Sequence, residues 1–190
     1  MSQTTALAIA VNDGDHMLGP ANAAVIVVHY GDYQCADCRS RHRQVQKLID
    51  SLSNRVRFVY RHFPLIKVHP NALRAAEAAE AAGAQGKFWE MHRLLCASPN
   101  KLRDRDLHGH ARAIGLDVNR FDREMADSTY ASQILKDCYH AINYGISGAP
   151  TTFINGELYA MSGVELLTAV ETILADSPTT MKTLTTSSRL

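Results

Sequence analysis

The chain has 190 residues, the length of one compact domain or of one domain with a subdomain insertion. Apolar residues make up 46% and charged residues 21%, which provides a sizeable core and excludes wholesale disorder. The net charge is +1 and the longest strongly apolar run covers only residues 23–28, so we expect neither general nucleic-acid binding nor a membrane-spanning helix.

The N-terminal residues 1–20 are predicted to form an irregular lead-in, because glycine, proline and small polar residues accumulate near its end. The first Lys or Arg of the chain is Arg39, so this segment lacks the positive region of a secretory signal. We therefore expect a cytoplasmic protein. In that reducing compartment, a close cysteine pair is more often catalytic or metal-binding than structural.

A parallel β-α-β unit is predicted from the next segments. Residues 25–30 are β-branched and almost entirely apolar, as in a strand buried on both faces. The sequence then changes to helical spacing, with Val45, Leu48 and Leu52 on one side. A second strand follows at residues 56–63, and the helix between the two strands favours a right-handed crossover.

A helical insertion is expected over residues 69–145, where several helical periods and no strand-like run occur. The sheet resumes at residues 151–154, turns at Asn155-Gly156 and returns. The last helix is predicted from Val164 to Ala175. These elements divide the chain into an α/β part, residues 21–68 and 146–176, the insertion, and a disordered tail at residues 177–190 that is rich in Thr and Ser.

Cys35 and Cys38 form a Cys-x-x-Cys pair where the first strand gives way to the helix. A sulfur at a helix N-terminus is stabilised as a thiolate by free N–H groups and the helix dipole, and only the thiolate is nucleophilic. Two intervening residues allow the pair to alternate between dithiol and disulfide. Half of a zinc site is the alternative interpretation, but we find no second Cys-x-x-Cys and no paired Cys/His ligands, so no metal site is predicted.

The cysteine pair and a distant Ser147–Thr151 segment together resemble the thioredoxin superfamily, specifically its DsbA-like disulfide oxidoreductases, in which a helical domain is inserted into the thioredoxin fold. The resemblance extends from about Leu18 to Ala175. The following further segments carry it: Asp15–Pro20, Arg61–Leu65, His69-Pro70, Ala75–Ala79, Gly86–His92, Gly115–Asp117 and Phe153–Gly156.

This resemblance implies an α/β thioredoxin fold and a role for each residue of the site. Cys35 would be the exposed attacking thiol and Cys38 the buried thiol that resolves the mixed disulfide. Pro150 would be a cis-proline opposite them. Ala149, which precedes it, would then offer its backbone to a polypeptide substrate as a neighbouring strand does.

Three residues depart from the usual family pattern. Asp37 lies between the cysteines, where its negative charge disfavours the Cys35 thiolate and indicates a less oxidising couple. Ala149 is smaller than the Thr or Val that is common there. His29 stands where an acid is often buried, so we hypothesise that it accepts the proton of Cys38; an idle imidazole bound to a backbone carbonyl is the alternative.

The remaining candidates have structural interpretations. Cys96 and Cys138 are expected as reduced core residues of the insertion, with a second disulfide between them as the less favoured alternative. The basic cluster of Arg39, Arg41, His42 and Arg43 is interpreted as a solvated helix face.

These observations predict a thiol–disulfide oxidoreductase that acts on protein or small-molecule disulfides without a metal or organic cofactor. Its expected partners are a protein or peptide thiol or disulfide substrate and an unidentified redox partner. Two alternatives remain open: a non-catalytic peptide-binding or chaperone-like module of thioredoxin fold, and a redox partner in thiol stress.

Overall fold

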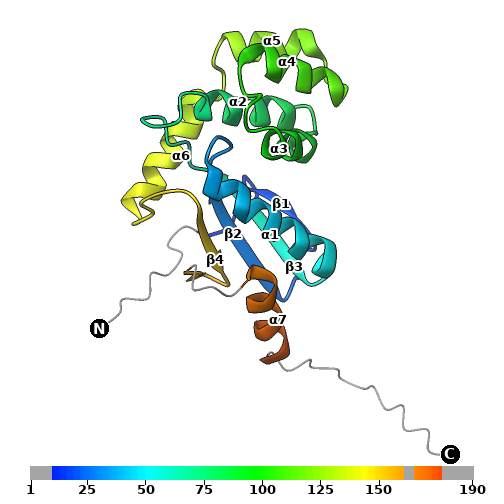
Figure 1. Cartoon of the computed structure of the whole chain (residues 1–190), viewed down its shortest axis with the longest axis vertical. Helices are drawn as coiled ribbons and strands as arrows, with labels where there is room; N and C mark the ends of the chain where they lie inside the picture. Colours follow the sequence, from blue (N-terminus) through cyan, green and yellow to red (C-terminus); the bar gives the residue numbers. More distant parts are fainter. Residues whose placement is uncertain (1–9, 161–164, 177–190) are drawn as a thin grey trace, which may run out of the picture.

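The computed structural model describes residues 10–160 and 165–176 as a five-stranded mixed sheet with helices around it (Figure 1). The strand order is β1-β3-β2-β4-β5. The strands are β1 (His16–Leu18), β2 (Val25–Gly31), β3 (Val56–His62), β4 (Thr151–Ile154) and β5 (Glu157–Leu158). The predicted α/β architecture, with helices inserted between the second and the third predicted strand, is present. The predicted tail at residues 177–190 lies outside the described residues.

The central strands β2 and β3 run parallel, in a register that pairs Val25 with Val56 and Gly31 with His62. Helix α1 (Ala36–Leu52) makes the crossover between them. On its other side, β2 pairs antiparallel with β4, so that His29 lies opposite Thr152. The carboxyl end of β2 thus delivers the chain directly to the start of α1, which is where the two neighbouring cysteines lie.

The lead-in contains a short strand that the sequence analysis missed. β1 pairs antiparallel with β3, with His16 opposite Tyr60. It is followed by Gly19, whose φ of +91° and close approach to the Val56 carbonyl leave no room for a side chain. Three residues between turn signals are too few to show the two-residue period of a strand, so the segment looked irregular.

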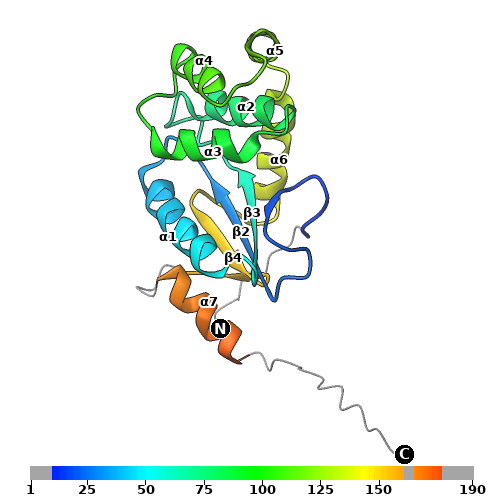
Figure 2. The same cartoon turned by 90° about the vertical axis from the view of Figure 1, so that its right-hand side faces the viewer.

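The two faces of the sheet contribute to separate cores because side chains alternate along β2. Val25 and Val27 pack with α1 and α7 (Leu166–Asp176), whereas Val28 and Tyr30 pack toward α6 (Ala131–Asn143). Figure 2 shows α1 and α7 on one side of the sheet and α6 on the other. His29 therefore shares the face of Val25 and Val27 and points toward α1.

Five helices lie between β3 and β4, in the segment predicted to be helical; the first four gather at one end of the sheet, and the last, α6, returns along one of its faces (Figures 1 and 2). They are α2 (Ala72–Gly83), α3 (Phe88–Ala97), α4 (Asp104–Ala113), α5 (Val118–Ala126) and α6. The central helix α2 is buried on most sides, which its run of alanines permits. Helix α3 packs against α2 and also contacts α1, so it reaches the cysteine pair from the side of the insertion.

Candidate functional site

The two neighbouring cysteines occupy the first turn of α1. Cys35 is the N-cap residue, in an extended conformation (φ −74°, ψ 128°), and its Sγ accepts a hydrogen bond from the backbone N–H of Cys38 at 3.4 Å. Both sulfurs are reduced in the structure. The Cys35 sulfur therefore takes the place of the oxygen that usually caps a helix, where free N–H groups favour negative charge.

The prediction that the Cys35 thiol is exposed is wrong. Only 6% of Cys35 and 5% of Cys38 are exposed. The reason is a tertiary contact, because the segment before β4 crosses the helix terminus and brings the Ala149 carbonyl to 3.8 Å from the Cys35 Sγ. A partner molecule would have to approach Cys35 along this segment.

The segment that covers Cys35 turns at Pro150, and the peptide bond between Ala149 and Pro150 is cis. Gly148, Ala149 and Pro150 are each partly exposed. The Gly148 carbonyl accepts a hydrogen bond from the Thr151 hydroxyl at 2.6 Å, which fixes the turn before β4 begins. Ala149 thus presents backbone next to the sulfur, as its predicted place beside the cysteine pair requires.

Cys38 is held as a protonated thiol by its surroundings. Burial raises its pKa, and the neighbouring Cys35 thiol and Asp32 carboxylate act in the same direction. The opposing influence is the backbone N–H of Asp32, which donates to the Cys38 Sγ at 3.4 Å. Cys38 is therefore a poor nucleophile until a reaction at Cys35 changes its surroundings.

Asp32 is a buried carboxylate beside the cysteine pair that was not predicted from the sequence. Its side chain is fully buried and accepts hydrogen bonds from Gln34 N (2.7 Å), Leu65 N (2.9 Å) and His69 Nδ1 (2.8 Å). The only available signal was a lone acid between an apolar strand and the first cysteine. Asp32 joins the α1 terminus to the loop after β3, and so holds the reactive turn in place.

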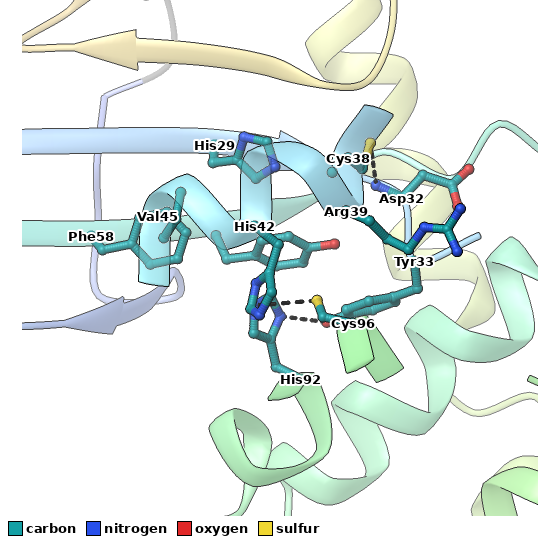
Figure 3. Close-up of a pocket in the computed structure, with 12 residues that line it drawn as sticks. His29, Asp32, Tyr33, Cys38, Arg39, His42, Val45, Phe58, His92 and Cys96 are labelled. Carbon is teal, nitrogen blue, oxygen red and sulfur yellow. Dashed lines mark hydrogen bonds between the residues drawn. The ribbon is translucent and has the colours of Figure 1, made fainter. Parts of the chain in front are cut away.

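The surroundings of His29 weigh against the hypothesis that it accepts the Cys38 proton near neutral pH, which stays a prediction. Burial, reinforced by the charges of Arg41 and His42, lowers the pKa of His29 to about 3. Its Nδ1 lies 3.0 Å from the Thr152 hydroxyl, which satisfies one ring nitrogen inside the sheet. Such an imidazole is a weak base in the resting protein, and it faces the same small cavity as Cys38 (Figure 3).

The first two turns of α1 differ from the predicted solvated face. Asp37 and Arg43 are exposed, but Arg41 is only 4% exposed, with its guanidinium 4.9 Å from the centre of the Tyr159 ring. The strand-like segment after β4 covers this part of the helix, a contact that helical spacing alone does not reveal. His42 is half-buried on the side of α1 that faces α3 (Figure 3).

A small cavity separates α1 from α3. Its volume of about 10 Å³ is room for about one water molecule, and Cys38 and Cys96 both line it. Cys96 and Cys138 are free thiols that pack in different cores, so no disulfide joins them here.

Two groups of side chains outside the cysteine pair have the composition of metal ligands. They are His42 with His92 and Cys96, and His16 with His62 and Glu80. In the second group, both imidazoles lie within hydrogen-bond distance of Glu80 Oε1, at 2.8 and 2.9 Å. These contacts outweigh the effect of burial and lower the pKa of Glu80.

Comparison with known proteins connects this geometry to a family. The sequence model of the family described as thioredoxin matches residues 11–172. Among solved structures, a thioredoxin-like oxidoreductase from Silicibacter pomeroyi DSS-3 is 28% identical with a TM-score of 0.72, covering 86% of this chain and 92% of its own. The thiol-disulfide exchange protein alpha-DsbA2 from Wolbachia pipientis is 20% identical with a TM-score of 0.74, covering 87% and 89%.

Curated relatives with higher identity are much longer proteins. A protein of Salinispora arenicola named Na(+)/H(+) antiporter NhaA 1 is 46% identical over 161 residues, which cover 84% of this chain and 24% of that protein. A Salinispora tropica protein named NhaA 3 is 46% identical over 144 residues, covering 76% and 22%. The chain thus spans about a quarter of the length of these relatives. None of the helices in residues 10–160 and 165–176 is long and apolar enough to cross a bilayer.

Proposed function

The chain belongs to the thioredoxin family, and we propose that it is a DsbA-like protein thiol–disulfide oxidoreductase whose reacting groups are Cys35 and Cys38. The observation that carries the proposal is the position of the Cys35 sulfur. It caps a 17-residue helix, receives the N–H of Cys38 at 3.4 Å and lies 3.8 Å from the Ala149 carbonyl. The Cys35 sulfur therefore lies where a helix N-terminus stabilises a thiolate, and it also lies beside the backbone that a substrate would contact.

The first step is attack by the Cys35 thiolate on one sulfur of a substrate disulfide. A mixed disulfide forms between Cys35 and the substrate, and the other substrate sulfur leaves as a thiolate that takes a proton from solvent. The partly exposed segment around Ala149 supports this step, because an extended substrate placed along it can form strand-like hydrogen bonds beside Cys35.

The second step is resolution by Cys38. Its thiol loses a proton, its sulfur attacks Cys35, and the departing substrate sulfur ends as a thiol, so the proton balance closes without a permanent base. The backbone N–H of Asp32 supports this step by donating to the Cys38 sulfur. An external redox partner, a protein or a small thiol, must then return the Cys35–Cys38 disulfide to the dithiol for reductive turnover; the reverse cycle oxidises substrates.

The test is turnover of a disulfide-bonded peptide with a dithiol as the terminal reductant. Cys35→Ser should abolish the reaction, whereas Cys38→Ser should accumulate a peptide adduct on Cys35 that mass spectrometry detects and reductant releases. Cys138→Ser is the matched control, since that thiol lies in another core, and it should keep full activity. Undiminished turnover by Cys35→Ser would overturn the proposal.

A peptide-binding module without turnover is the second candidate, favoured by the partly exposed backbone beside Cys35. It predicts that a disulfide-free peptide binds equally well to the wild type and to the protein with both cysteines replaced by serine, with no turnover by either. The cytoplasmic location remains a prediction from the sequence.

A further inference from the structure

Helices α1 and α3 face each other with matching pairs of metal-ligand residues. Cys38 and His42 are four residues apart on α1, and His92 and Cys96 are four residues apart on α3. Residues at this spacing lie on the same side of a helix. All four residues line the small cavity between the helices. Because three residues separate the members of each pair and the pairs lie on different helices, no Cys-x-x-Cys motif marks them in the sequence.

Three of these side chains bring their ligand atoms together. The ligating atoms of His42, His92 and Cys96 all lie within 4.8 Å of one another. His92 Nε2 lies 3.8 Å from Cys96 Sγ (Figure 3). Tetrahedral zinc with ordinary bond lengths requires about 3.6 Å between a nitrogen and a sulfur ligand. The observed separation therefore needs only a small contraction around an ion.

The imidazole of His92 is already oriented for this role. Its Nδ1 lies 3.0 Å from the hydroxyl of the buried Tyr33. When Nδ1 carries the proton and donates to that oxygen, the lone pair of Nε2 points toward Cys96. Metal-bound histidines are commonly fixed by such a hydrogen bond from the second ring nitrogen.

The third ligand, His42, is available and lies next to solvent. Its ring is half-buried and packs against His92, with ring centres 5.2 Å apart, and within the described part of the chain no hydrogen bond holds its nitrogens. His42 and Cys96 also line an open cavity of about 570 Å³ on the outer side. An ion can enter there, and a solvent ligand can complete its coordination.

We propose that His42, His92 and Cys96 bind one divalent cation of the zinc class, with a solvent-derived fourth ligand. Imidazole and thiolate together suit zinc and exclude magnesium and calcium, which prefer oxygen ligands. On binding, the Cys96 thiol releases its proton to solvent. Arg39 and Arg43 line the outer cavity, so their charge opposes the cation and favours an anion in the fourth position.

The other ligand-like group, His16 with His62 and Glu80, is a second candidate site for the same metal ion in this protein. Its two imidazoles and its carboxylate already satisfy one another through hydrogen bonds at 2.8 and 2.9 Å. It also contains no sulfur. A probe that reports a thiolate ligand therefore distinguishes the two groups.

The experiment titrates Co²⁺ into the full chain with Cys35→Ser and Cys38→Ser, which removes the reactive dithiol as a ligand. A thiolate bound to Co²⁺ gives a charge-transfer band in the near ultraviolet. We expect one ion per chain with this band. Cys96→Ser in the same background should lose the band, and His42→Gln should weaken Co²⁺ binding at least about tenfold. Cys138→Ser and His62→Gln are matched controls and should behave as the parent.

The proposal is overturned if the parent gives no band, if Cys138→Ser removes it, or if His62→Gln weakens binding as much as His42→Gln. Should the doubly substituted chain fail to fold, the unsubstituted protein with Cys35 and Cys38 oxidised to a disulfide replaces it, with the same controls. Because turnover is never measured, failure here leaves the proposed oxidoreductase activity standing, and loss of that activity leaves the metal site standing.

Discussion

Cys38 and Cys96 line one cavity from opposite helices, yet their surroundings are different. Burial raises the pKa of both thiols. The Cys38 sulfur receives a backbone N–H and follows Cys35 by three residues, whereas the Cys96 sulfur faces an imidazole 3.8 Å away. A backbone N–H can stabilise a transient thiolate. An imidazole lone pair beside a thiolate can instead bind a metal ion together with that thiolate. The neighbouring donor, and not burial, separates exchange chemistry from ligand chemistry.

The largest expected difference among the four thiols is in alkylation. Burial raises the pKa of Cys38, Cys96 and Cys138, so these thiols stay protonated near neutral pH. We expect brief iodoacetamide treatment of the reduced protein to label Cys35 at least about tenfold faster than any other cysteine, as measured by peptide mass mapping. In denaturant the preference should disappear. Fastest labelling of Cys96 would break the distinction drawn above.

Acid should destabilise the side of the cavity that carries the imidazoles. Burial lowers the pKa of His29 to about 3 and places the pKa values of His42 and His92 below the usual 6.5. From pH 6.5 downward the unfolded chain binds protons that the folded chain does not. The free energy of unfolding should therefore fall as pH falls, by up to about 1.4 kcal/mol per pH unit for each histidine.

Urea unfolding of the apo protein between pH 7.5 and pH 4.5 measures this slope. His29→Asn should reduce this slope by the contribution of up to one bound proton. The reason is that the substituted chain lacks one of the groups that titrate only when the chain is unfolded. The same slope in the variant and the wild type would mean that His29 is hydrated and titrates normally.

On the side of the exchange chemistry, Asp32→Asn should lower the free energy of unfolding at pH 7 by about 1–3 kcal/mol. Its carboxylate accepts three hydrogen bonds, one from His69, and the neutral amide weakens the charged interactions and places a donor where an acceptor is needed. Urea titration measures the loss. Asp37→Asn is the exposed control and should change stability by less than about 0.5 kcal/mol.

The smallest expected effect belongs to Asp37. Replacing it with His should make the Cys35–Cys38 couple more oxidising, because a negative charge that disfavours the thiolate is removed. Since Asp37 is exposed and its charge is screened, the rise in reduction potential should be less than about 30 mV, as measured against a glutathione buffer. A fall in the potential would show that another contact of Asp37 dominates.

Most of the fold was predictable because long elements carry their own period. The runs at β2 and β3, the helical spacing of α1 and the Asn-Gly turn each specify their structure locally. β1 was not predicted, because its pairing with β3 is set by a distant strand rather than by its own three residues. The insertion was predicted to be helical, but the sequence did not indicate that α3 brings His92 and Cys96 to α1.

The candidate site followed the same rule. The pair Cys35 and Cys38 was visible as a local motif, and its link to Pro150 came from family resemblance. The burial of Cys35 by Ala149, the anchoring of Asp32 by His69 and the low pKa of His29 all depend on contacts between residues far apart in the sequence. Local patterns located the sulfur atoms but left their environments undetermined.

The helix cap at Cys35 couples the folding equilibrium of the chain to the reduction of the Cys35–Cys38 disulfide. In the dithiol, the Cys35 sulfur accepts the N–H of Cys38 and so stabilises the start of α1. If the dithiol form unfolds with a larger free energy than the disulfide form, the same difference must raise the reduction potential above that of the unfolded chain. A difference of about 1.4 kcal/mol between the unfolding free energies of the dithiol and disulfide forms then corresponds to about 30 mV in reduction potential. Unfolding curves of the two redox forms therefore measure how far folding shifts the potential.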